Sequence, residues 1–285
     1  MTSIAVVTDT DASLPDDLAK AHGIRQVPIN IHFGEEALQS GVDIDDATLF
    51  ERVDREGVLP TTSAPTPGQF AAAYRDAFEA GNDLVLCFCV SAEVSGTYNS
   101  ALQARDLISG GRVTVVDSRT ISMGQGYMAL AAAAAVKDGA SEEEAVARAV
   151  SVRERTYLYA ALDTLKYLAM SGRVGHLAAG MASVLGIKPI LTLADGKLDL
   201  LEKVRTRRKA WRRVTELVGQ QLKDRPAEQL AILYVGAVDE AQLFEAQLRE
   251  AVRCPDEIIF ADFTPGLSVH TGPGMVGVVV VAPET

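Results

Sequence analysis

The sequence contains few of the residues that mark secreted, membrane-spanning or metal-rich proteins. Among its 285 residues are three cysteines, four histidines and one tryptophan. Its first residues lack the basic start and apolar stretch of a signal peptide. The longest apolar run, Met128 to Val136, is too short and too rich in alanine to cross a bilayer. These absences predict a cytoplasmic protein with reduced thiols.

Metal, nucleotide and nucleic-acid sites are also missing as sequence patterns. No His-x-x-His or Cys-x-x-Cys spacing is present, and Asp9, Asp11 and Asp117 follow strand-like runs, where aspartate commonly caps loops, so we predict no metal and no cofactor. No Gly-x-x-x-x-Gly-Lys-[Ser/Thr] loop and no Gly-x-Gly-x-x-Gly after a strand is found. The net charge of -11 argues against a nucleic-acid partner, because phosphate contacts need clustered lysine and arginine.

Strand-like and helix-like segments alternate through the first half of the chain. We predict helices from Pro67 to Ala80, from Ser95 or Tyr98 to Ile108, from Met128 to Lys137 and from Ser141 to Glu154. Strand character recurs at Ile4–Val7, Leu84–Val90, Val113–Val116, Tyr157–Leu162, Ile187–Leu193, Leu198–Val204, Leu230–Val235, Ile258–Ala261 and Met275–Val280. Alternation of this kind predicts a mostly parallel sheet covered by helices, with ligands bound beyond the carboxyl ends of the strands.

The second half has a different pattern. Ala194-Asp195-Gly196 joins two strand runs with a strong hairpin signal, so its sheet must contain an antiparallel pair. The predicted fold class is therefore α/β with two α/β domains, residues 1–156 with a mostly parallel sheet and residues 157–285 with a mixed sheet.

Three short segments rich in hydroxyl groups and glycine stand out as candidate sites. They are Pro60 to Pro65, Ser95 to Ser100 and His270 to Gly274. Loops that open into helices expose backbone N–H groups, so three such loops favour a pocket for an anion such as a carboxylate or phosphate. Taken alone, the same serines and threonines fit turn or helix N-cap roles equally well.

At these segments the chain resembles the DegV family of fatty-acid-binding proteins, and the resemblance extends over its whole length. The matching elements, in chain order, are Val7-Thr8-Asp9-Thr10 with Leu14-Pro15, Val27-Pro28-Ile29, Gly41-Val42-Asp43-Ile44, Thr62 to Pro65, Ser95 to Ala101, Asp117-Ser118 with Gly124-Gln125-Gly126, Leu165 to Arg173, Ile187-Lys188-Pro189 and His270 to Gly274. The chain departs from the family at Asp9-Thr10-Asp11, where Asp-Ser-Thr is common, and at Ala37 to Gly41, where an aromatic-x-Asp-Gly element is common.

The resemblance implies a buried tunnel, between or beside the domains, that holds a long-chain fatty acid. It implies that the carboxylate is bound by the first two loops, with His270 and Arg173 at the head group. The implied carboxylate-binding residues are Thr62, Ser63, Ser95, Gly96, Thr97, His270 and Arg173. The alternative for Arg173 is a surface arginine at a helix end. Small residues at Ala129–Ala135 and Ala178–Ala182 either leave room for the acyl tail or let helices pack closely.

A basic cluster near residue 208 interrupts this acidic chain. It comprises Arg205, Arg207, Arg208, Lys209, Arg212 and Arg213, of which Arg205, Arg208, Lys209 and Arg212 share one face at helical spacing. The cluster is interpreted either as a solvated helix face or as a surface on which the kinase subunit that serves the family docks.

The function that follows from the resemblance is that of a non-catalytic lipid-binding subunit. The protein would present the fatty-acid carboxylate to a separate ATP-dependent kinase subunit, which forms an acyl phosphate for phospholipid synthesis, with only transient membrane contact. The alternative is a hydrolase or acyltransferase that uses Ser95 as nucleophile and His270 as base, although the chain has no Gly-x-Ser-x-Gly elbow. A nucleotide-binding regulator on the same sheet is a third possibility.

Overall fold

The computed structural model describes residues 2–173 and 186–284, which fall into two compact units. One unit comprises Met1–Asp43 and Thr62–Glu154, and the other comprises Ile44–Thr61 and Arg155–Thr285. The sequence-based boundary at residue 156 lies close to the division after Glu154. The structure differs from the two contiguous predicted domains because residues 44–61 belong to the second unit, where helix α2 (Asp46–Glu56) packs against helix α10 (Pro265–Thr271).

The first unit is built on a parallel sheet of four strands, as the alternating pattern predicts. Its order is β2-β1-β6-β7, and every pair of neighbours is parallel. The strands are β1 (Ile4–Asp9), β2 (Ile24–Val27), β6 (Leu84–Cys89) and β7 (Arg112–Asp117). All six residues of β6 are buried, which is typical of a parallel strand covered on both faces.

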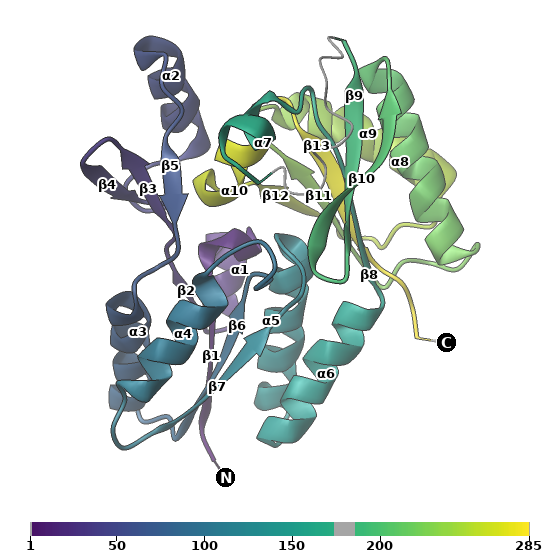
Figure 1. The fold of residues 1–285 in the computed structure, drawn as a ribbon. Coiled ribbons are helices and arrows are strands. Elements are labelled where there is room, and N and C mark those ends of the chain that lie inside the picture. Colours follow the sequence, from purple (N-terminus) through teal and green to yellow (C-terminus); the bar gives the residue numbers. More distant parts are fainter. Residues whose placement is uncertain (1, 174–185, 285) are drawn as a thin grey trace. The chain divides into compact units, whose positions relative to one another are not determined.

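Helices cover both faces of this sheet (Figure 1). On one face lie α3 (Pro67–Glu79) and α4 (Thr97–Asp106), which bury Phe70, Tyr74 and Ala101 against the strands. On the other face lies α5 (Met123–Lys137), with α6 (Glu142–Glu154) packed along it. The short elements η1 (Thr10–Ala12) and α1 (Asp16–Ala21) follow β1.

A small sheet that sequence analysis did not predict lies between β2 and α3 along the chain. Its order is β4-β3-β5, from β3 (Asn30–Phe33), β4 (Glu36–Gln39) and β5 (Thr61–Ser63). Strands this short carry little periodicity. The predicted loop Pro60 to Pro65 is therefore partly a strand, and it does not follow one.

The second unit contains a mixed sheet of six strands, which confirms the second half of the predicted fold class. Its order is β10-β9-β8-β13-β11-β12, with β11 and β12 parallel and the other pairs antiparallel. The predicted hairpin at Asp195 joins β9 to β10. The strands are β8 (Thr156–Ala161), β9 (Lys188–Ala194), β10 (Lys197–Val204), β11 (Gln229–Tyr234), β12 (Ile259–Asp262) and β13 (Val276–Val281).

Two long helices cover one face of the mixed sheet. They are α8 (Arg207–Leu222) and α9 (Val238–Ala251), which bury Val214, Val218 and Phe244 against Ile232 and Val278. The single tryptophan, Trp211, packs on Phe244 in this core, with ring centroids 5.8 Å apart. The remaining helix, α7 (Lys166–Met170), lies close to α10.

The thiols and the helix lengths agree with the composition of the chain. Cys87 and Cys89 are buried on the same face of β6, with sulfur atoms 3.7 Å apart, and neither is in a disulfide. Among the helices within residues 2–173 and 186–284, none is long and apolar enough to span a bilayer. In the same residues no group of three or more histidine, cysteine or carboxylate side chains is arranged to hold a metal ion.

Candidate functional site

The Thr-Ser segment is held by polar contacts from β3. Asn30 and His32 alternate along this strand and therefore share a face. The Asn30 Nδ2 atom donates to the Ala64 carbonyl at 3.1 Å, and the His32 Nε2 atom lies 2.8 Å from the Ser63 Oγ atom. Thr62 is half-buried and Ser63 is exposed, so the hydroxyl of Ser63 remains accessible while its loop is held.

The next turn of the chain begins α3 with a reciprocal pair of hydrogen bonds. The Thr66 hydroxyl accepts from the Gln69 backbone N–H, and the Gln69 side chain accepts from the Thr66 backbone N–H. This capping box, with Pro67 at the first helical position, ends the loop at a defined place.

The Ser-Gly-Thr segment forms the start of α4. The Ser95 Oγ atom lies 2.8 Å from the Thr97 Oγ1 atom and accepts the Thr97 backbone N–H at 3.3 Å. The helix begins at Thr97 with Gly96 as its N-cap, so the prediction of an N-cap at Ser95 is displaced by one residue. Ser95 is half-buried, Gly96 is exposed and Thr97 is buried, which places the accessible hydroxyl beside an open helix N-terminus.

The first unit brings these two segments together. The Ser100 hydroxyl, one turn into α4, donates to the Pro65 carbonyl. A Cβ atom built on Gly96 would lie 4.0 Å from the Ala64 side chain, an ordinary van der Waals distance. Two hydroxyl-bearing loops and the positive end of a helix dipole therefore meet in one place, as an anion site requires.

His270 has a different environment from the one predicted. Sequence analysis placed it in one of the three candidate loops, but it lies half-buried in the last turn of α10, ahead of β13. Burial, together with the nearby positive charge of Arg173, lowers the pKa of His270 to about 3. Its imidazole is therefore neutral at physiological pH and contributes hydrogen bonding without a full positive charge.

The turn after His270 depends on its first glycine. Gly272 has φ of 77° and ψ of 172°, a backbone region that is essentially restricted to glycine. A Cβ atom at this position would lie 2.2 Å from the Tyr167 ring, which itself packs edge-on against Phe50 of α2. Helices α2, α7 and α10 are thus packed around one aromatic pair.

Arg173 is exposed and lies in the turn that follows α7. Its Nη1 atom donates to the Ser171 carbonyl at 3.0 Å, and Ser171 is the C-cap of that helix. The contact matches the alternative interpretation of Arg173 as a helix-end cation. Thr62, Ser63, Ser95, Gly96 and Thr97 belong to the first unit, and Arg173 and His270 belong to the second.

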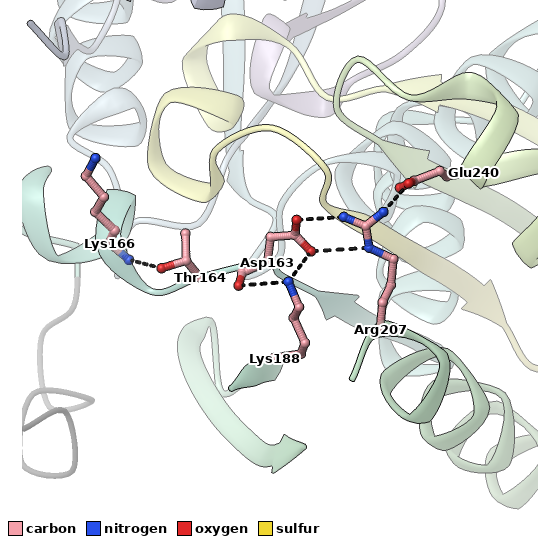
Figure 2. Close-up of polar contacts among 6 residues, drawn as sticks. All are labelled: Asp163, Thr164, Lys166, Lys188, Arg207 and Glu240. Atoms are coloured by element: carbon pink, nitrogen blue, oxygen red, sulfur yellow. Dashed lines mark hydrogen bonds and ion pairs between the residues drawn. The ribbon is translucent and has the colours of Figure 1, made fainter. Parts of the chain in front are cut away.

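Figure 2 shows an ion-pair cluster of the second unit, and Gly274 of the Gly-Pro-Gly turn lies beside it. The Asp163 carboxylate contacts the Arg207 Nη2 atom at 2.6 Å and the Lys188 Nζ atom at 2.8 Å, and Arg207 also pairs with Glu240. Burial alone would raise the pKa of Asp163, but hydrogen bonds and charge from Lys188 and Arg207 outweigh it and lower that pKa. A Cβ atom on Gly274 would lie 3.1 Å from Asp163, so the turn packs directly on the cluster.

The ion pairs divide the predicted basic cluster into two sets. Arg207 is committed to Asp163 and Glu240, and Arg213 to Glu202 and Glu216. The exposed set comprises Arg205, Arg208, Lys209 and Arg212, the four residues predicted to share a face, of which Arg212 also forms an exposed pair with Glu216 at 3.7 Å. Of the predicted docking residues, Arg207 is thus anchored inside the unit, while the other four project from its surface near the start of α8.

The fold and the paired loops define a class: a two-unit α/β protein with hydroxyl-bearing segments where a helix begins beyond a parallel strand. A family profile described as "Uncharacterised protein, DegV family" matches residues 3–283, and the chain belongs to this family. It is 36% identical to a DegV domain-containing protein of Streptomyces coelicolor over 97% of this chain and 98% of the relative.

Solved structures of the same family have the same fold. A DegV family protein from Thermus thermophilus, described with its fatty-acid binding, aligns with a TM-score of 0.92 and 31% identity over 99% of this chain and 100% of that one. A stearic-acid-binding protein from Eubacterium ventriosum aligns with a TM-score of 0.88 and 26% identity over 99% of this chain and 98% of that one.

Two residues at the paired loops were not selected from the sequence, and Ser100 was part of a candidate segment but was not assigned a contact. Asn30 and His32 belong to the short strand β3, and Ser100 lies on the buried side of α4. Their period-two and helical spacings were visible, but neither pattern indicates which distant loop a side chain will contact. The predicted small-residue segment Ala178–Ala182 lies outside the described residues, as does His176.

Proposed function

We propose that this protein binds a long-chain fatty acid and presents its carboxylate to a separate ATP-dependent kinase subunit for acyl phosphate formation. One observation supports the proposal most strongly. Two loops that the family resemblance assigns to one carboxylate adjoin each other in the first unit, although about thirty residues separate Thr62 from Ser95 in the sequence. Solved structures similar to this chain are described as binding fatty acids, so the anion bound at such a site would be a fatty-acid carboxylate.

In this proposal the first unit supplies the hydroxyl groups that bind the carboxylate. Thr62, Ser63 and Ser95 donate hydrogen bonds, while Gly96 and Thr97 contribute the open N-terminus of α4. Hydrogen bonds to a charged acceptor contribute about 1.5–3 kcal/mol each. For His270 and Arg173, a head-group role rests on the family resemblance alone.

The acyl tail would provide most of the binding free energy. Burying about sixteen methylenes at about 0.8 kcal/mol each gives a nominal gain of roughly 13 kcal/mol before ordering costs. The alanines of α5 give less support to a space for the acyl tail than the amino-acid sequence suggested. Ala129 and Ala132 are buried, and α5 packs on α6, whose Ala145 and Ala149 are also buried, which favours close helix packing as the role of these small residues.

The proposed ligand leads to a direct binding prediction. Purified protein is expected to release long-chain fatty acids on denaturation and solvent extraction, detected by mass spectrometry, and the emptied protein to gain thermal stability when fatty acid is added. Thr62→Val and Ser95→Ala should each weaken fatty-acid binding about tenfold, since each removes one charge-assisted hydrogen bond.

The control for these variants is Thr192→Val, which removes a hydroxyl bonded at 2.9 Å to the Leu158 carbonyl within the second sheet. Its fatty-acid affinity should equal that of the wild type. Protein that carries no extractable fatty acid and gains no stability from added fatty acid would contradict the proposal. A covalent acyl adduct on Ser95, after incubation with an activated acyl ester, would instead support the hydrolase or acyltransferase alternative.

The exposed basic residues support the proposed kinase partner. Arg208 and Lys209 occupy the first turn of α8, where the helix dipole disfavours positive charge, and that turn contains no acidic residue. Thr206 caps the helix by accepting the Lys209 backbone N–H, so the basic side chains are not needed for the cap. Cations placed where they weaken a helix are better explained by an acidic partner than by stability.

The docking surface can be tested by charge reversal. In an assay containing fatty acid, ATP and a candidate kinase subunit, Arg208→Glu with Lys209→Glu should lower the rate of acyl phosphate formation at least tenfold and leave fatty-acid affinity unchanged. The charge-matched control is Lys137→Glu with Arg148→Glu, two exposed residues of the first unit. Equal rates for the two double variants would show that α8 is not the docking surface.

A further inference from the structure

The contact between His32 and Ser63 adds one residue to the predicted carboxylate-binding site. The His32 Nε2 atom lies 2.8 Å from the Ser63 Oγ atom. On the same strand Ile31 and Phe33 are buried, so the alternation of β3 turns His32 toward Ser63 while its apolar neighbours anchor the strand. A half-buried strand thus places an imidazole beside an accessible hydroxyl.

The direction of this hydrogen bond decides what Ser63 offers to a ligand. A serine hydroxyl has one hydrogen, and a carboxylate only accepts hydrogen bonds. If Ser63 donates to an unprotonated Nε2 atom, it presents only lone pairs to the carboxylate. If the Nε2 atom carries the hydrogen and donates, the hydrogen of Ser63 is released for the carboxylate.

The loop backbone has other supports, so His32 is not needed to hold it. Asn30 donates to the Ala64 carbonyl, and its Oδ1 atom in turn accepts from Gln69 at 3.2 Å. Ser100 donates to the Pro65 carbonyl from the other side. Among these three contacts, only that of His32 is made to a side-chain hydroxyl. His32 therefore affects the direction of the Ser63 hydroxyl.

We infer that His32 is a positioning residue that donates from its Nε2 atom to Ser63 and thereby turns the Ser63 hydrogen toward the fatty-acid carboxylate. This inference rests on the proposed function, because it assigns a partner to a residue of the proposed carboxylate-binding site. It also makes His32 a determinant of head-group specificity. A carboxylate needs the Ser63 hydrogen, whereas a primary alcohol can donate its own hydrogen to the Ser63 oxygen.

The test compares the affinities for palmitic acid and hexadecanol in four variants of His32 and Ser63. His32→Leu should weaken palmitic acid binding about tenfold and change hexadecanol binding less than twofold. His32→Gln, whose side-chain amide can also donate to Ser63, should restore most of the affinity for the acid. Combining His32→Leu with Ser63→Ala should cost no more than Ser63→Ala alone, because His32 acts through Ser63.

A spectroscopic measurement and a matched control complete the design. In ¹⁵N NMR spectra, adding palmitic acid should give His32 the signature of a ring protonated at Nε2. His22→Gln, an exposed histidine of the same unit, should leave both affinities unchanged. Wild-type protein that binds no palmitic acid would overturn the proposed function and this inference together. Wild-type binding that His32→Leu preserves at an unchanged acid-to-alcohol ratio would overturn this inference alone.

Discussion

Replacing Gly272 with alanine is expected to destabilise the second unit by about 3 kcal/mol or more. The backbone at Gly272 lies in a region that costs other residues about 1–3 kcal/mol. The added methyl group would also lie 2.2 Å from the Tyr167 ring, where no Cβ atom fits without movement of the aromatic pair. The measurement is urea unfolding followed by the fluorescence of Trp211, which reports on the core of this unit.

The two contributions to this loss can be separated. Gly236→Ala, at φ of 70° with no atom within 4 Å of the new Cβ, should show the backbone cost alone and lose about 1–2 kcal/mol. Adding Tyr167→Ala to Gly272→Ala should restore the part of the stability that the overlap with the ring removes. The double variant should therefore lose less stability than the sum of the two single variants. If Gly272→Ala loses no more than Gly236→Ala, packing against Tyr167 does not restrict this position.

The second large effect is expected at Asp46, a buried carboxyl at the start of α2. Its Oδ1 atom accepts from the Ser268 hydroxyl of α10 at 2.5 Å, and its Oδ2 atom has no hydrogen-bond partner among the described residues. Burial and the negative charges of Asp262 and Asp45 raise the pKa of Asp46 to about 8, against the smaller opposing effect of Ser268. The side chain is therefore protonated in the folded protein at neutral pH.

This raised pKa fixes the sign of the pH dependence. An unfolded aspartate loses its proton near pH 4, whereas folded Asp46 keeps its proton until about pH 8. Between those values the folded state binds more protons than the unfolded state, so stability falls as pH rises, by up to about 1.4 kcal/mol per pH unit. The helix dipole of α2 favours the charged form of Asp46 and reduces this loss of stability. We therefore expect Asp46 to lower the free energy of unfolding by about 2–3 kcal/mol at pH 8.

Asp46→Asn should remove this cost, because asparagine stays neutral and its carbonyl can still accept from Ser268. The variant should be about 2–3 kcal/mol more stable than the wild type at pH 8 and about equal to it at pH 4, measured by urea unfolding with Trp211 fluorescence. The control is Asp45→Asn. The backbone N–H of Thr48 lowers the pKa of Asp45, so the contribution of Asp45 is present above its unfolded pKa and is lost as pH falls. A pH-independent difference between Asp46→Asn and the wild type would contradict the assignment.

Local patterns predicted the helices α3 and α4 at the site but not the small sheet that carries His32 and Ser63. The helix from Pro67 and the hairpin at Asp195 both follow from short-range rules, and the structure contains each of them. The order of strands and helices also predicted the parallel sheet and the mixed sheet. These features depend on turn chemistry and periodicity, which neighbouring residues determine.

The sequence by itself thus determined the fold class, the family and the hydroxyl-bearing loops. Only the tertiary structure assigned residues 44–61 to the second unit, placed His270 in a helix, committed Arg207 to Asp163 and set His32 against Ser63. Three of these depend on contacts between segments far apart in the chain, and the helix at His270 was missed because its seven residues carry little periodicity. A hydrogen bond or ion pair across such a separation leaves no period in the sequence, because its geometry exists only after the elements have packed.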